Sequence, residues 1–239
     1  MNADLLTIDS YGDGAELILI HGFGWNSTIW QPILEPLCLH HRVHVVQLPK
    51  ILDDLKKLAA AIADKCPNPA TWLGWSIGGL IALQAAADYP NQVKKLILVA
   101  SSPCFMEKNN WPGITQPALE QMQCNLQTNK LQAIKKFVQL QTNGNYPLTQ
   151  ALNVPTYHSD YDQSGLTLLK NSDLTRLIEH IRCPILGIFG KKDRLVPQAL
   201  STLLAQYMDI QLFDSAHLPF YEQPHLFIKT INEFTQNAA

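Results

Sequence analysis

The chain has 239 residues, 46% of them apolar, which is enough for one large domain with a substantial core. Its net charge of −2 gives no basic field that would recruit nucleic acid or an anionic membrane. No apolar run is long enough to span a bilayer, the N-terminus lacks a signal-peptide pattern, and the five cysteines are scattered. We therefore expect a soluble, cytoplasmic monomer with free thiols.

The first half of the chain alternates between short apolar runs and amphipathic segments. Apolar or β-rich runs predict strands at residues 16–20, 42–48, 71–73 and 95–100. Helical spacing predicts helices at residues 27–37, capped by Ser27, at 51–66 and at 77–89. The alternation predicts an α/β fold with a doubly wound, mostly parallel sheet, whose sites lie at the carboxyl edge of the strands.

The pattern of apolar residues changes after Pro103. Long runs of valine, isoleucine and leucine are missing as far as Arg182, and prolines interrupt helical patterns at residues 119–126, 131–140 and 166–177. Further on, the patterns predict a strand at 184–190, a helix at 197–207, a strand at 210–213 and a helix at 225–236. We therefore predict a core formed by residues 1–103 and 183–239, and a helical lid formed by residues 104–182.

A serine lies at the turn between the strand at 71–73 and the helix that follows it. Gly74-Trp75-Ser76-Ile77-Gly78 has the Gly-x-Ser-x-Gly pattern of a nucleophile elbow, in which a sharp turn exposes the serine hydroxyl at the end of a sheet. A glycine-rich turn without catalytic function is the alternative interpretation. The strand-turn-helix context favours Ser76 as a nucleophile.

A serine nucleophile needs a base and a carboxylate that orients the base. His217 follows a late strand, whereas His158 and His180 fall in the insertion and His225 falls in the final helix. Asp193 directly follows the strand at 184–190. The other candidate acids lie in the insertion or beside the short strand at 210–213: Asp160, Asp162, Asp173, Asp209 and Asp214. We predict His217 as base and Asp193 as acid, against the alternatives of a surface histidine and a solvated turn carboxylate.

Two backbone N–H groups are expected to stabilise the oxyanion of such a reaction. One belongs to Ile77, after the nucleophile, and the other to Phe23, in the Gly-bearing loop after the first buried strand. His21 is expected to brace that loop. The sequence has no metal-ligand cluster and no phosphate-binding glycine loop, so we expect neither a metal nor a cofactor.

With these motifs in place, the chain resembles the α/β-hydrolase superfamily, and more narrowly the pimeloyl-acyl-carrier-protein methyl ester esterases of biotin synthesis. The resemblance rests on the elbow, on the segment from Val99 to Phe105, on Trp111 to Ile114, and on the matches at Leu195-Val196-Pro197 and Ala216-His217. It implies a serine carboxylesterase that hydrolyses the methyl ester of a pimeloyl chain on acyl carrier protein, through an acyl-enzyme on Ser76.

The resemblance also implies a substrate site. It comprises Phe23, Ser76, Ile77, Phe137, Val138, Gln139, Leu140, Gln141 and His217. Residues 121–157 contain no acid but carry Lys130, Lys135 and Lys136, a charge pattern that fits an acidic carrier protein or merely a solvated helix face. The chain departs from the family pattern in two ways. The loop after Pro49 is shorter than in the family. The basic residues of the family's lid are mostly arginine, and only Lys136 lies at one of those positions with its positive charge retained.

Two other functions remain open at this point. One keeps the chemistry but changes the substrate, as in a general short-acyl carboxylesterase acting on small-molecule esters or a hydrolase of carbon–carbon bonds. The other is a non-catalytic ligand-binding protein with the same fold.

Overall fold

The computed structural model describes residues 6–145 and 163–236. Within them, seven strands form one sheet in the order β1-β3-β2-β4-β5-β6-β7, and only β1 runs antiparallel to its neighbour. The strands are β1 (Thr7–Tyr11), β2 (Ala15–Ile20), β3 (His41–Gln47), β4 (Ala70–Trp75), β5 (Val93–Val99), β6 (Ile185–Gly190) and β7 (Asp209–Phe213). This topology confirms the predicted α/β fold with a doubly wound, mostly parallel sheet.

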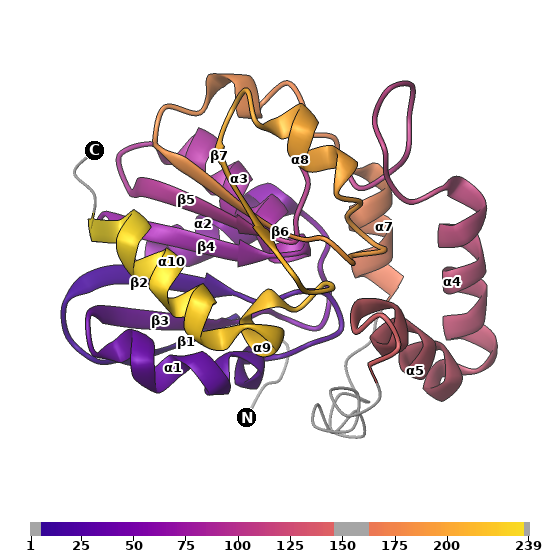
Figure 1. Ribbon diagram of the computed structural model, residues 1–239, viewed down its shortest axis with the longest axis horizontal. Helices are drawn as coiled ribbons and strands as arrows, with labels where there is room; N and C mark the ends of the chain where they lie inside the picture. The colour runs from indigo at the N-terminus through magenta and orange to yellow at the C-terminus, as the bar shows by residue number, and fades with distance from the viewer. Residues whose placement is uncertain (1–5, 146–162, 237–239) are drawn as a thin grey trace.

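Helices cover both faces of the sheet. The helices α1 (Gln31–Cys38) and α10 (Pro224–Gln236) pack together on one face, while α2 (Leu55–Lys65) and α3 (Ile77–Asp88) pack on the other (Figure 1). Because neither face meets water, β4 and β6 are buried along their whole length. Nearly all of α3 is buried as well, since it is covered by the sheet and by α2.

The helical insertion lies between β5 and β6. Its helices are α4 (Gln116–Thr128), α5 (Lys130–Gln141) and α7 (Gln163–Asn171). Thr115 and Asn129 cap the amino ends of α4 and α5 with side-chain hydrogen bonds, and the two helices pack against each other. In Figure 1 the pair stands beside the sheet, at the side where β6 leads into its following loop.

Several boundaries differ from the sequence-based prediction because local capping decides them. The helix expected to begin at residue 51 begins at Leu55, since the Asp54 side chain accepts hydrogen bonds from the N–H groups of Lys56 and Lys57. Residues 51–54 therefore lengthen the loop after Pro49 beyond what the sequence suggested.

Three further differences concern the ends of helices, and a fourth is an unexpected strand. The cap before the first helical segment, η1 (Ser27–Trp30), is Asn26 rather than Ser27. The helix predicted at 166–177 ends at Asn171, and the one predicted at 197–207 is the short α8 (Ala199–Leu204). The strand β1 was not predicted, because its largely exposed residues lack the apolar run that marks the other strands.

Candidate active site

Ser76 occupies a strained turn between β4 and α3. Its backbone has φ 56° and ψ −121°, a left-handed conformation that costs energy in a residue with a side chain. A Cβ atom on Gly74 would lie 2.2 Å from the Gly78 carbonyl oxygen, and one on Gly78 would lie 2.3 Å from the Ile20 oxygen. The two glycines therefore let β2, β4 and α3 converge on Ser76.

Hydrogen bonds hold this turn in place from the neighbouring strand. The Ser76 N–H donates to the Val99 oxygen at 2.9 Å, and the Ser76 carbonyl accepts from the Ser101 hydroxyl at 2.7 Å. The Gly79 N–H donates to the same carbonyl at 2.9 Å. The end of β5 thus fixes the serine backbone while its hydroxyl stays outside these contacts.

Asp193 and His217 form a buried pair at the same edge of the sheet. The Nδ1 atom of His217 lies 2.7 Å from Oδ2 of Asp193, and neither side chain is exposed to solvent. The other carboxylate oxygen, Oδ1, accepts the N–H groups of Leu195 at 2.8 Å and Val196 at 3.0 Å. A carboxylate held in this way fixes the proton of neutral His217 on Nδ1 and leaves the lone pair on Nε2.

The Nε2 atom of His217 is buried and has no hydrogen-bond partner among the described residues, Ser76 included. Trp75 connects His217 to the serine turn: it precedes Ser76 in the chain, its ring centroid lies 5.6 Å from that of His217, and its indole N–H donates to the His217 carbonyl at 2.8 Å. An unpartnered basic nitrogen beside a strained serine can accept a proton from a hydroxyl.

The loop after β2 also lies against Ser76. A Cβ atom on Gly22 would lie 3.2 Å from the Ser76 Cβ, so the backbone leading to Phe23 adjoins the serine. His21 braces this loop, because its Nδ1 bonds the Gly22 oxygen at 2.9 Å and its Nε2 accepts the Leu48 N–H at 3.1 Å. Burial lowers the pKa of His21 to about 4, so it stays neutral.

The predicted residues of α5 divide into two groups. Phe137, Val138 and Gln141 are buried, and the Phe137 ring contacts the Phe23 ring with centroids 6.0 Å apart. Gln139 and Leu140 are exposed and face outward. They line a cavity of about 460 Å³ that does not include Ser76. The structure thus brings only part of the predicted substrate set to the catalytic edge.

Of the three predicted carrier-patch lysines, Lys136 lines two cavities formed by described residues. One is the cavity of about 460 Å³ that Gln139 and Leu140 also line. The other is an adjoining apolar cavity of about 450 Å³ between α4, α5 and the loop after β6. Lys130 and Lys135 are exposed on the same helix. Arg194 lines both cavities with Lys136, and sequence reasoning missed it although it directly follows Asp193.

The alternative acids and bases lie elsewhere where the structure describes them. Asp173 pairs with Lys108, and Asp214 pairs with Lys192 at 2.8 Å. His180 and His225 are exposed. Asp209 is exposed at the start of β7. His158, Asp160 and Asp162 lie outside the described residues. Residues 6–145 and 163–236 contain no group of three side chains that could hold a metal ion.

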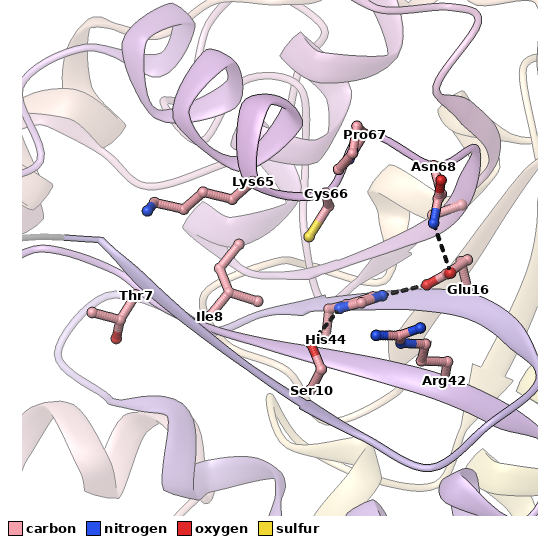
Figure 2. Close-up of a pocket in the computed structure, with 11 residues that line it drawn as sticks. Thr7, Ile8, Ser10, Glu16, Arg42, His44, Lys65, Cys66, Pro67 and Asn68 are labelled. Atoms are coloured by element: carbon pink, nitrogen blue, oxygen red, sulfur yellow. Dashed lines mark hydrogen bonds and ion pairs between the residues drawn. The ribbon is translucent and has the colours of Figure 1, made fainter.

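A separate, polar cavity lies at the opposite, amino end of the strands (Figure 2). It measures about 440 Å³ and contains a chain of side chains in which Ser10 Oγ lies 2.7 Å from His44 Nδ1, while His44 Nε2 bonds Glu16. Asn68 donates to the other Glu16 oxygen at 3.1 Å. This serine is exposed on an edge strand, without the strained turn that presents Ser76.

The Glu16 contacts predict a pH-dependent contribution to stability. Partial burial raises the pKa of Glu16, but the hydrogen bonds from His44 and Asn68 outweigh it and hold the pKa below the usual value. A carboxylate with a lowered folded-state pKa stabilises the fold above its unfolded pKa, and this is lost as pH falls through the folded pKa. We expect Glu16→Gln to lower the free energy of unfolding by about 1 kcal/mol at pH 7.

Urea denaturation at pH 7 and pH 3 measures this effect. The difference between Glu16→Gln and wild type should shrink at pH 3, while Glu35→Gln, at an exposed site on α1, should show little effect at either pH. A Glu16→Gln deficit that is equally large at pH 3 would mean that shape, rather than charge, is the source of the contribution.

With the geometry described, the class of protein follows from comparison with known families. Residues 17–230 match the model of the alpha/beta hydrolase family, and the chain belongs to this family. A protein of Shewanella woodyi named pimeloyl-[acyl-carrier protein] methyl ester esterase is 35% identical, covering 96% of this chain and 97% of its own. A protein of Pectobacterium carotovorum with the same name is 34% identical over 92% of this chain and 94% of its own.

Solved structures agree on the fold. An esterase from Exiguobacterium antarcticum superposes with a TM-score of 0.87 and 21% identity, covering 97% of this chain and 96% of its own. A hydrolase from Oleispira antarctica gives a TM-score of 0.88 at 19% identity, covering 97% and 94% respectively. In the described ranges no helix is both long and apolar enough to cross a membrane.

Proposed function

We propose that this protein is a serine carboxylesterase that hydrolyses the methyl ester of pimeloyl-acyl carrier protein. The observation that carries the substrate assignment is the 34–35% identity, over nearly the whole chain, to relatives with that name. The chemistry is supported by the buried pair of Asp193 and His217 and by the strained turn at Ser76, which Trp75 connects to His217. We infer that the insertion between β5 and β6, which includes α4, α5 and α7, acts as a lid for this site.

In the proposed reaction the Ser76 oxygen attacks the ester carbonyl while its proton moves to Nε2 of His217. The negative oxygen of the tetrahedral intermediate accepts hydrogen bonds from the N–H groups of Phe23 and Ile77. The intermediate collapses, the bond to the methoxy oxygen breaks, and His217 returns the proton so that methanol leaves. Asp193 stabilises the imidazolium throughout the transfer.

The acyl-enzyme is then hydrolysed by the same groups. Water gives a proton to His217 and attacks the acyl carbonyl, the bond to Ser76 breaks, and the proton returns to the serine oxygen. The products are the free carboxylate of the pimeloyl chain, still attached to its carrier, and the regenerated enzyme. No metal or cofactor takes part in these steps.

The experiment that tests the substrate assignment compares two methyl esters. We expect kcat/KM for carrier-linked pimeloyl methyl ester to exceed that for free dimethyl pimelate by at least tenfold. Equal efficiency would instead favour a general short-acyl esterase. Failure of both esters to react, together with no covalent labelling by a fluorophosphonate, would favour a non-catalytic binding protein.

The carrier is proposed to dock beside Lys136 and Arg194, with Lys130 and Lys135 contributing to its attraction. The two adjoining cavities between α4, α5 and the loop after β6 have these two cations and no acidic side chain in their lining. A surface with one sign of charge speeds association with an oppositely charged partner. A carrier protein with an acidic surface fits this charge.

Charge reversal tests this docking. We expect Lys135→Glu with Lys136→Glu, and separately Arg194→Glu, to lower kcat/KM for the carrier-linked ester about tenfold at low salt. The deficit should shrink at high salt, because screening removes the steering. Rates on p-nitrophenyl esters should stay near wild type. The matched control is Lys94→Glu, an exposed lysine at the amino end of β5. An equal loss on both substrates would mean that the lid was damaged.

A further inference from the structure

The carboxyl end of the lid helix α5 contacts two parts of the candidate active site through one residue. Gln141 is the last residue of α5 and is 1% exposed. Its main-chain oxygen accepts the His217 N–H at 2.9 Å. Its side-chain oxygen accepts the indole N–H of Trp25 at 2.9 Å. Gln141 therefore touches both the loop of the proposed base and the loop that leads from the proposed oxyanion donor.

The first contact answers a requirement of the helix itself. The last four carbonyl groups of a helix have no partner within it, and a buried carbonyl without a partner is costly. At Gln141 the missing donor is the N–H of His217, which comes from a segment far along the sequence. The end of the lid helix and the backbone of the histidine are thus fixed by the same hydrogen bond.

The second contact completes a ring of four residues that contact one another in turn. Trp25 packs against Trp75 with ring centroids 5.8 Å apart. Trp75 in turn donates its indole N–H to the His217 carbonyl at 2.8 Å. Starting from Gln141, the contacts run through Trp25, Trp75 and His217 and return to Gln141. All four residues are buried, so water does not compete for these hydrogen bonds.

We propose that Gln141 is a positioning residue that fastens the lid helix to the catalytic centre and so holds the His217 loop and the Phe23 loop in register with Ser76. This assignment rests on the proposed hydrolase function and differs from the substrate contact that the resemblance implies for Gln141. Its side-chain oxygen is already bonded to Trp25. Seating of α5 and alignment of the proposed base and oxyanion donor then depend on one another.

The test removes the hydrogen bond between the Trp25 and Gln141 side chains by changing each partner separately. Gln141→Met keeps the length of the side chain but has no amide oxygen, and Trp25→Phe keeps an aromatic ring but has no N–H donor. Each variant should lower kcat on p-nitrophenyl butyrate about tenfold, with KM within twofold of wild type. Because replacing both partners by apolar groups leaves no unsatisfied donor, the double variant should be no slower than the slower single variant.

Two controls accompany these measurements. Gln132→Met makes the same change at an exposed position of α5 and should leave kcat unchanged. Thermal unfolding of every variant shows whether it is folded at the assay temperature, and the rate of fluorophosphonate labelling measures the reactivity of Ser76 without turnover. Labelling should slow in parallel with kcat in the single variants.

Three outcomes would overturn the assignment. A rise in KM with unchanged kcat in Gln141→Met would make Gln141 a substrate contact. Fully additive losses in the double variant would mean that the two side chains act independently. A lower melting temperature with unchanged kcat would leave only a structural role. A wild-type enzyme that hydrolyses p-nitrophenyl butyrate but shows no preference for a carrier-linked ester would refute the proposed substrate and leave this test intact.

Discussion

Replacing Ser76 by alanine is expected to lower kcat by about 10⁶, close to the loss that follows when a serine nucleophile is removed from an enzyme of this mechanism. Without the Ser76 hydroxyl no acyl-enzyme forms, and the buried His217 is left with only water to activate. The fold should survive, because the hydrogen bonds that hold the turn use the Ser76 backbone and not its hydroxyl. The measurement is steady-state turnover of a p-nitrophenyl ester by each protein.

The matched control for this substitution is Ser10→Ala. Ser10 bonds a histidine that pairs with a carboxylate, but it lies at the amino end of the sheet (Figure 2). We expect wild-type turnover and wild-type fluorophosphonate labelling from Ser10→Ala, and neither from Ser76→Ala. Turnover at the wild-type rate by Ser76→Ala would rule out the proposed nucleophile and with it the proposed mechanism.

The succession of buried strands along the chain could be predicted because it rests on local patterns. Buried strands such as β2 and β4 are continuous apolar runs, and the strained turn at Ser76 needs glycines at fixed spacing. The strand β1 carries no such signal, since pairing with β3 stabilises a strand whose side chains are mostly in water. Local patterns could not reveal a strand that its neighbour specifies.

Some residues of the candidate site could likewise be predicted from local patterns, and others could not. Asp193 and His217 could be chosen because each directly follows a late strand, and the structure pairs them at 2.7 Å. The contacts of Gln141 and the cavity position of Arg194 join segments far apart in the chain. No local pattern encodes which carbonyl a buried N–H will find, so these features emerge only from the folded chain.

Helix ends were predicted less well than helix centres for a related reason. A helix begins where a side chain satisfies its first N–H groups, and at α2 that residue is Asp54 although apolar spacing extends back to Ile51. The same displacement lengthens the loop after Pro49. The Leu52 N–H in this loop donates to the Ser164 hydroxyl of α7 at 2.8 Å, which ties the core to the insertion.

Asp193→Asn should lower kcat by about 10⁴ while leaving the fold intact. The asparagine oxygen can still accept the N–H groups of Leu195 and Val196, but its amide nitrogen would face Nδ1 of His217 as a donor. Neutral His217 would then carry its proton on Nε2, and this nitrogen could not accept the Ser76 proton.

Turnover of a p-nitrophenyl ester measures the loss, and Asp214→Asn, at an exposed carboxylate after β7, is the control. A loss smaller than tenfold would mean that Asp193 does not orient the base, because the wrong tautomer cannot sustain the reaction.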